Sequence, residues 1–133
     1  MKESDFQFTN PSLSYLKFEE NKEFVRKQDK SIEIGTEIKA GNHKIDDTKA
    51  IVSIFIKVGD EEITTPFCLQ IEFVAEFDWN KELNDEKVEL FLNQNAPALL
   101  LSYARPIISM ITNSSHFPAY NLPFINFADA KKE

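Results

Sequence analysis

The chain has 133 residues, 28% of them charged and 42% hydrophobic, and its formal net charge is −7 at pH 7. This length fits a single domain, 1–133, that can bury a core, and the composition excludes a disordered chain. Nucleic-acid binding requires a basic face, and the nearest candidate, Arg26–Lys27, is surrounded by acidic residues. The acidity indicates either a solubility feature or a basic partner.

Three features predict a cytoplasmic location. The single cysteine, Cys68, cannot form an internal disulfide, which favours a reducing compartment. Residues Met1–Asn10 lack the apolar stretch of a signal peptide. The longest apolar run, Ala96–Ile111, contains Arg105 and is too short to span a bilayer.

The first two thirds of the chain show the alternation of β-strands. A first strand is predicted from Phe6 to Phe18, with a bulge around Pro11 where the alternation changes phase. A second strand, ended by Gly41–Asn42, is indicated by three isoleucines, Ile32, Ile34 and Ile38.

The two clearest strands follow, at residues 51–58 and 63–79, joined by the hairpin signal Gly59–Glu62. In the longer run one parity is almost entirely apolar and the other mainly polar, so one face is expected to be buried and the other solvated. The apolar parity consists of Ile63, Thr65, Phe67, Leu69, Ile71, Phe73, Ala75, Phe77 and Trp79. The four strands together predict a four-stranded antiparallel meander.

A helix is predicted to begin at Asn95, as an N-cap with Pro97 just inside, and to end at Asn113–Ser115. Pro106 removes one backbone hydrogen bond in its middle and predicts a kink. The polar side chains fall within roughly 100° of arc, which leaves about 260° of apolar surface. They are Ser102, Arg105, Ser109, Thr112 and Asn113.

That wide apolar arc predicts a second packing layer, because one sheet covers only one side of a helix. The layer is expected to be another copy of the chain, and the alternative is that the segment Phe117–Phe127 folds back over the helix. The resulting fold class is α+β, with the long C-terminal helix packed on the sheet.

No catalytic or metal-binding constellation is visible in the sequence. His43, His116 and Cys68 lack the spacing of a zinc site, and a nucleophilic pair of Cys68 with His116 has no local support. The three glycines form no phosphate-binding loop. The sequence therefore predicts a protein without enzymatic activity, metal or cofactor.

A more specific signal lies in the C-terminal third. The helix contains Tyr103-Ala104-Arg105 and Ser109-Met110, and residues 117–127 read Phe-Pro-Ala-Tyr-Asn-Leu-Pro-Phe-Ile-Asn-Phe. This combination resembles the SecB export-chaperone family, with Pro123 displaced by one residue from the family's position. Phe67–Ile71 and Phe6–Phe8 look like the family's fourth and first strands.

The resemblance implies a dimer of dimers with helices sandwiched between two sheets, and ATP-independent binding of unfolded preproteins in apolar grooves. The helix residues expected at the oligomer interface are Leu100, Tyr103, Ala104, Ile107, Ile108 and Ile111. The positions that match the family's groove are Ile32, Ile34, Phe117, Tyr120, Leu122, Phe124 and Phe127, and each is equally a candidate for the protomer's own core.

Two departures from the family concern its motor protein, SecA. The family's C-terminal helix and zinc-binding tail, which docks on SecA, have no counterpart before Ala130–Glu133. Gln70 replaces an acid in the family's SecA-facing strand, where Glu72 and Glu76 still supply an acidic face. The resemblance therefore leaves SecA open as a partner.

Three functions remain open, and the first is favoured. They are a general holdase for unfolded or exported chains, a binding module for one dedicated partner such as an antitoxin, and a small enzyme with an apolar pocket. Gene neighbourhood separates the first two, and an enclosed pocket with convergent polar groups would support the third.

Overall fold

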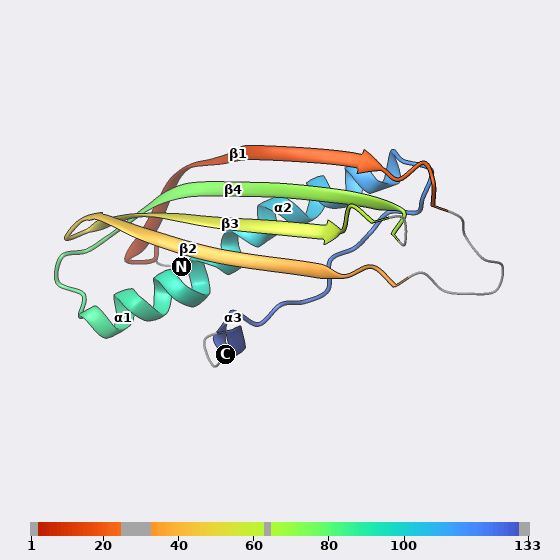
Figure 1. The fold of residues 1–133 in the computed structure, drawn as a ribbon. Coiled ribbons are helices and arrows are strands. Elements are labelled where there is room, and N and C mark those ends of the chain that lie inside the picture. Colours follow the sequence, from red (N-terminus) through yellow and green to blue (C-terminus); the bar gives the residue numbers. More distant parts are fainter. Residues whose placement is uncertain (1–2, 25–32, 63–64, 131–133) are drawn as a thin grey trace.

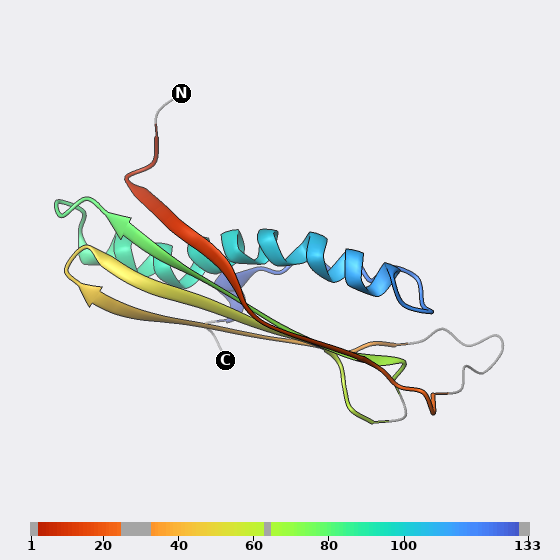
Figure 2. The ribbon, with the colours of Figure 1, turned by 90° about the horizontal axis from the view of Figure 1, so that it is seen from above.

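The computed structural model describes residues 3–24, 33–62 and 65–130. Its four strands form one antiparallel sheet, and its helices lie on one face of that sheet (Figure 1 and Figure 2). In chain order the elements are β1 (Phe6–Glu20), β2 (Thr36–Asp46), β3 (Lys49–Gly59), β4 (Phe67–Trp79), α1 (Asp85–Leu90), the π-helical stretch η1 (Phe91–Asn95), α2 (Ala96–Asn113) and α3 (Phe127–Ala130).

This architecture confirms the predicted sheet and C-terminal helix, but the strand order differs from a simple meander. β2, β3 and β4 are neighbours in space as in sequence, whereas β1 lies at the far edge beside β4, in the order β1-β4-β3-β2. The arrangement is a Greek key. Alternation within a strand shows which face is buried but not which edge the strand joins, so the sequence pattern could not supply this detail.

The limits of β2 also differ from the prediction. The strand begins at Thr36 and continues through Gly41–Asn42, because β3 offers backbone partners along its whole length. The hairpin turn follows Asp46, whose Oδ1 accepts the backbone N–H of Thr48 at 2.8 Å. Ile34 precedes the strand, and Ile32 lies outside the described residues.

Two backbone irregularities match the sequence pattern. The pairing of β1 with β4 shifts register between Thr9 and Ser12, which confirms the bulge around Pro11, and Asn10 there has a φ of 52°. Gly59 ends β3 with a φ of 76°, and a Cβ atom at this position would lie 2.0 Å from the carbonyl oxygen of Phe67. The hairpin signal at Gly59 therefore marks a turn that only glycine fits.

The core lies between the sheet and the helices. The predicted alternation of β4 is confirmed from Thr65 onward, with the odd-numbered side chains buried. The helices contribute a row at four-residue spacing, which places it on one helical face, and burial of each large member stabilises the fold by roughly 1.5–3 kcal/mol. The row consists of Val88, Leu92, Ala96, Leu100, Ala104 and Ile108.

The long helix begins earlier than predicted. Asn84, not Asn95, is the N-cap, and its side-chain oxygen accepts the backbone N–H of Lys87 at 2.8 Å. Asn95 has helical angles and caps nothing, because it ends the stretch η1, where the N–H of Ala96 bonds to the carbonyl of Phe91 five residues before it. Residues 85–113 are thus helical without a break, and the helix continues through Pro106.

Candidate functional site

After α2 the chain reverses and runs back beside the helix to α3 (Figure 1). We call residues 114–126 the return segment. The guanidinium of Arg105 donates to the carbonyl oxygens of Leu122 and Pro123, the latter at 2.8 Å. Thr112 Oγ1 accepts the backbone N–H of Tyr120 at 2.7 Å. The segment thus folds back on the helix, which was the less favoured alternative from the sequence, and its hydrogen bonds attach it to the polar arc.

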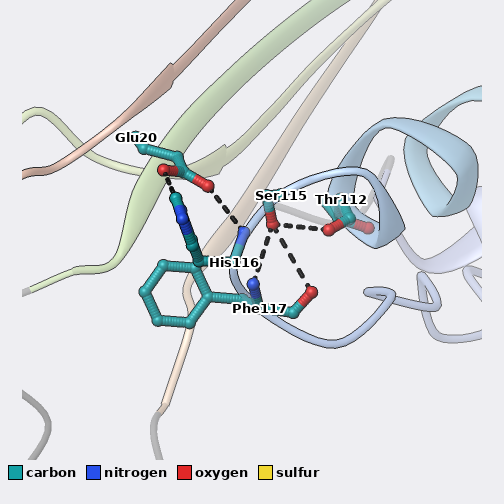
Figure 3. A network of polar contacts seen from close by, with 5 residues as sticks. All are labelled: Glu20, Thr112, Ser115, His116 and Phe117. Atoms are coloured by element: carbon teal, nitrogen blue, oxygen red, sulfur yellow. Dashed lines mark hydrogen bonds and ion pairs between the residues drawn. The ribbon is translucent and has the colours of Figure 1, made fainter.

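The return segment starts in a turn that is fixed to the end of β1 (Figure 3). The two carboxylate oxygens of Glu20 lie 2.7 Å from the backbone nitrogen of His116 and 2.8 Å from its Nδ1. The hydrogen bond from the backbone of His116, followed by that from its side chain, holds the pKa of Glu20 below its usual value. Ser115 Oγ donates to the carbonyl of Thr112 at 2.5 Å and closes the turn onto the helix.

Aromatic packing supports the same turn. The ring of Phe117 lies 5.9 Å from that of Phe24 and 6.4 Å from that of Phe67, and Phe67 is in turn 5.6 Å from Phe18. These are centroid distances of ordinary aromatic pairs. Phe117, predicted to line a groove, thus lies half-buried against the sheet and positions the turn in this structure.

The other predicted groove residues lie just before β2, along the return segment and at the start of α3. Tyr120 and Ile34 are half-buried against the core, and the hydroxyl of Tyr120 lies 2.7 Å from Oγ1 of Thr36. Leu122 and Phe127 are only 6% and 7% exposed. Phe124 differs from all of these, because its side chain is 90% exposed. Apart from Phe124, the described members are therefore buried or half-buried within the protomer.

The helix residues predicted at the oligomer interface divide into two groups. Leu100, Ala104 and Ile108 are fully buried within the protomer, in the helical row that packs in the core, so they offer no surface to a second copy. Tyr103 is 38% exposed, and Ile107 and Ile111 are half-buried. The ring of Tyr103 packs against Phe8 and Phe73, which places this flank of the helix on the β1 side of the sheet.

Exposed apolar residues beyond that prediction extend the same surface. Met110 on α2 is 63% exposed, and Leu99 is half-buried one turn before Tyr103. On β1, Leu13 and Leu16 are exposed although their partners in register, Phe73 and Ile71, belong to the buried face. We call this surface the apolar flank; it consists of Leu13, Leu16, Leu99, Tyr103, Ile107 and Met110.

The face of the sheet opposite the helices carries the three residues considered for SecA. Glu72 accepts a hydrogen bond from Ser14 Oγ at 2.6 Å, and Glu76 lies 4.0 Å from Nζ of Lys49. Gln70 lies in register with Lys17 and Lys57, and its Nε2 is 3.8 Å from Sγ of Cys68. Acidic and basic groups therefore alternate over this face.

Hollows elsewhere on the described chain are open and polar at their rims. One of them, of about 580 Å³, is lined by Phe18, Cys68 and a mostly charged rim at the ends of β1 and β3. Within residues 3–24, 33–62 and 65–130, no group of three His, Cys, Asp or Glu side chains is placed to hold a metal ion. None of the helices in these ranges is both long and apolar enough to cross a bilayer.

Comparison with known proteins agrees with this architecture. The family described as "Preprotein translocase subunit SecB" matches residues 6–130. The uncharacterized protein MJ0357 of Methanocaldococcus jannaschii is 32% identical over 127 residues, which cover 92% of this chain and 79% of that protein.

Two solved structures share the fold. The first is the SecB-like chaperone Rv1957 of Mycobacterium tuberculosis, in complex with a ChAD peptide from the antitoxin HigA1. It superposes with a TM-score of 0.68 at 15% identity, over 92% of this chain and 88% of that one. The second is a Streptococcus agalactiae protein of unknown function, with a TM-score of 0.54 at 12% identity, over 90% and 97% of the two chains.

Proposed function

The chain belongs to the SecB family, and on that premise we propose that it is a cytoplasmic, ATP-independent chaperone that binds unfolded polypeptides, including precursors destined for export. The observation that carries this proposal is the apolar region between β2 and the return segment. We assign to it Ile34 and Tyr120, which pack against the hydrophobic core, and Leu122 and Phe127, which belong to that core. We add the exposed ring of Phe124.

The chemistry of this region suits an extended chain better than a small substrate. Aromatic and aliphatic side chains bind apolar segments with little sequence preference, and many weak contacts along one client add up through avidity. The exposed ring of Phe124 favours binding of a client, because burial of a Phe side chain stabilises a complex by roughly 1.5–3 kcal/mol.

Self-association is the second part of the proposal. The apolar flank remains uncovered by the described part of the protomer, and a second copy that packs there would place helices between two sheets, as in a dimer of dimers. Of the interface residues proposed from the sequence, Tyr103, Ile107 and Ile111 remain candidates. Leu99, Met110 and the two leucines of β1 are added to them.

A dedicated client is the second candidate function. It is favoured by the SecB-like chaperone of Mycobacterium tuberculosis, which shares the fold and was solved with a peptide from an antitoxin. Both candidates use the same apolar region and differ only in the breadth of clients. SecA binding through the outer sheet face is a weaker extension, because lysines interrupt the acidic residues there.

One binding experiment tests the proposal. Fluorescence anisotropy compares α-lactalbumin that is reduced and carboxymethylated, and so permanently unfolded, with the native protein, without nucleotide. We expect binding to the unfolded form alone. Phe124→Ser should weaken it roughly tenfold, about 1.4 kcal/mol. Leu90→Ser, at an exposed leucine on α1, is the matched control and should bind as the wild type does.

The outcomes separate the two candidates. Binding to the unfolded form that Phe124→Ser weakens supports a general holdase. Absence of binding to either form contradicts it and favours a single dedicated partner, which a peptide array of proteins encoded next to this chain would then identify. Equal binding by both variants would show that Phe124 is not part of the binding surface.

A further inference from the structure

The proposed binding region is closed in this structure. One wall is the stretch that enters β2, with Ile34 before the strand and Thr36 at its start, and the other is the return segment, with Tyr120 and Leu122. All four side chains are buried or half-buried, and Ile34 and Tyr120 pack against the core. A client that uses these apolar groups must therefore first part the two walls.

One polar contact joins the walls directly. The hydroxyl of Tyr120 lies 2.7 Å from Oγ1 of Thr36, a distance typical of a short O–H···O hydrogen bond. We call this contact the hydroxyl bridge. It links side chains 84 residues apart in the sequence, one on an edge strand and the other on the return segment.

The two ends of the bridge are held by backbone hydrogen bonds to different parts of the protomer. The backbone of Tyr120 is fixed to the helix, because its N–H donates to Oγ1 of the fully buried Thr112 at 2.7 Å. Thr36 follows Gly35, whose carbonyl accepts the N–H of Gly59 at 2.9 Å. Both walls are thus anchored by their backbones, and the ring of Tyr120 is the part that can swing without detaching either of them.

The bridge is weak enough to open. Both hydroxyls are half-buried, so each can exchange its partner for water, and a neutral hydrogen bond of this kind contributes little net stability. The Arg105 contacts to Leu122 and Pro123 are charge-assisted and join helix and segment, so they can persist while the bridge is broken.

We propose that the hydroxyl bridge between Tyr120 and Thr36 is a latch that holds the polypeptide-binding region shut and that an incoming client must break. The inference rests on the proposed function and adds its regulation. The free protein keeps Ile34, Tyr120 and Leu122 largely from solvent, whereas Phe124 stays exposed, and a client gains access to the covered groups only where its own contacts exceed the cost of opening.

The test is a double-mutant cycle on Tyr120→Phe and Thr36→Val, each of which removes one hydroxyl and keeps the shape of the side chain. Binding of carboxymethylated α-lactalbumin is followed by anisotropy and stopped flow. We expect each variant to bind roughly threefold to tenfold more tightly, mainly through faster association. The double variant should bind no more tightly than either single one, because both remove the same bond.

Tyr15→Phe, which removes a hydroxyl from an exposed tyrosine on β1, is the matched control and should leave binding unchanged. Hydrogen exchange of residues 118–124 without client gives a second readout and should accelerate in both latch variants.

The outcomes distinguish the latch from the function it regulates. Weaker binding, additive effects or unchanged exchange in the latch variants, while the wild type binds, would overturn the latch alone. Absence of binding by the wild type and by every variant would overturn the proposed function and the latch with it. Binding by Tyr120→Phe when the wild type shows none would support both.

Discussion

One flank of α2 is covered by the chain itself, and the other is exposed. On the polar flank, Arg105 and Thr112 bind the backbone of the return segment, so the chain itself provides the cover. On the apolar flank, Tyr103 and Met110 remain exposed beside an edge strand with exposed leucines. Hydrogen bonds specify one partner at one distance, whereas apolar surface accepts any partner of suitable shape. The difference separates the flank that holds the protomer's own chain from the flank that is proposed to meet a second copy.

The largest expected effect lies on the apolar flank. Met110→Asp places a carboxylate where a second copy is proposed to pack, and its desolvation costs several kcal/mol for each copy of the interface. We expect light scattering to give the molar mass of a smaller species, while circular dichroism remains that of the wild type.

Ser102→Asp adds the same charge to the exposed polar side of the same helix and should leave the molar mass unchanged. An unaltered molar mass for Met110→Asp would show that the apolar flank is not the interface. Ile108→Asp cannot replace this variant, because Ile108 is fully buried in the protomer core and its substitution tests folding.

A smaller effect is expected on the polar flank. Arg105→Ala removes both bonds to the return segment, and bonds to a charged group are worth roughly 1.5–3 kcal/mol each, less here because one of them is exposed. Urea denaturation should show a loss of about 2 kcal/mol. Arg105→Lys keeps the charge but cannot donate to both carbonyl oxygens in the same geometry, so it should retain only part of the stability that Arg105→Ala loses. Stability equal to the wild type would mean that apolar contacts alone hold the segment.

The smallest effect concerns the turn at which the return segment begins. The pKa of Glu20 is lower in the folded state than in the unfolded chain. The contribution of this carboxylate to the stability of the fold is therefore present above its ordinary pKa and is lost as the pH falls through the lowered pKa. The amide resonance of His116, followed by NMR, should therefore show a transition in acidic solution, as the pH falls through the lowered pKa of Glu20.

Glu20→Gln should abolish that acidic transition, and Glu19→Gln, at the neighbouring exposed position, should preserve it. A transition that survives in Glu20→Gln would assign the effect to another group.

Local pattern was sufficient for much of the fold. The alternation of β3 and β4 predicted their faces, and Gly59 marked the turn between them, because both depend on neighbours in sequence. The edge joined by β1 and the start of the long helix could not be predicted in the same way. Pro97 lies two residues after Asn95, a spacing typical of a helix start, but here both residues lie at the end of a widened turn inside a helix.

The candidate site was predicted in part for a similar reason. Resemblance to a family supplied the groove positions, and among the described ones the structure links Tyr120 to the start of β2. The resemblance could not predict the contact of Thr36 with Tyr120, which lies 84 residues away in the sequence, or the pairing of Glu20 with His116. The division of the interface residues into buried and exposed also needed the structure, because a wide apolar arc does not show which part meets the sheet.

The widened turn η1 has a consequence for how this helix tolerates changes in length. In an ideal α-helix each four-residue step rotates the next side chain by about 40°, so a row such as Val88, Leu92 and Ala96 would wind away from the sheet. A π-helical turn takes in one extra residue and sets the row back by about 100°. Deletion of one residue from 91–95 would make the helix regular, yet it would rotate Val88 out of the core. The extra residue keeps the two halves of the helix in phase, so point substitutions here are expected to be milder than any change of length.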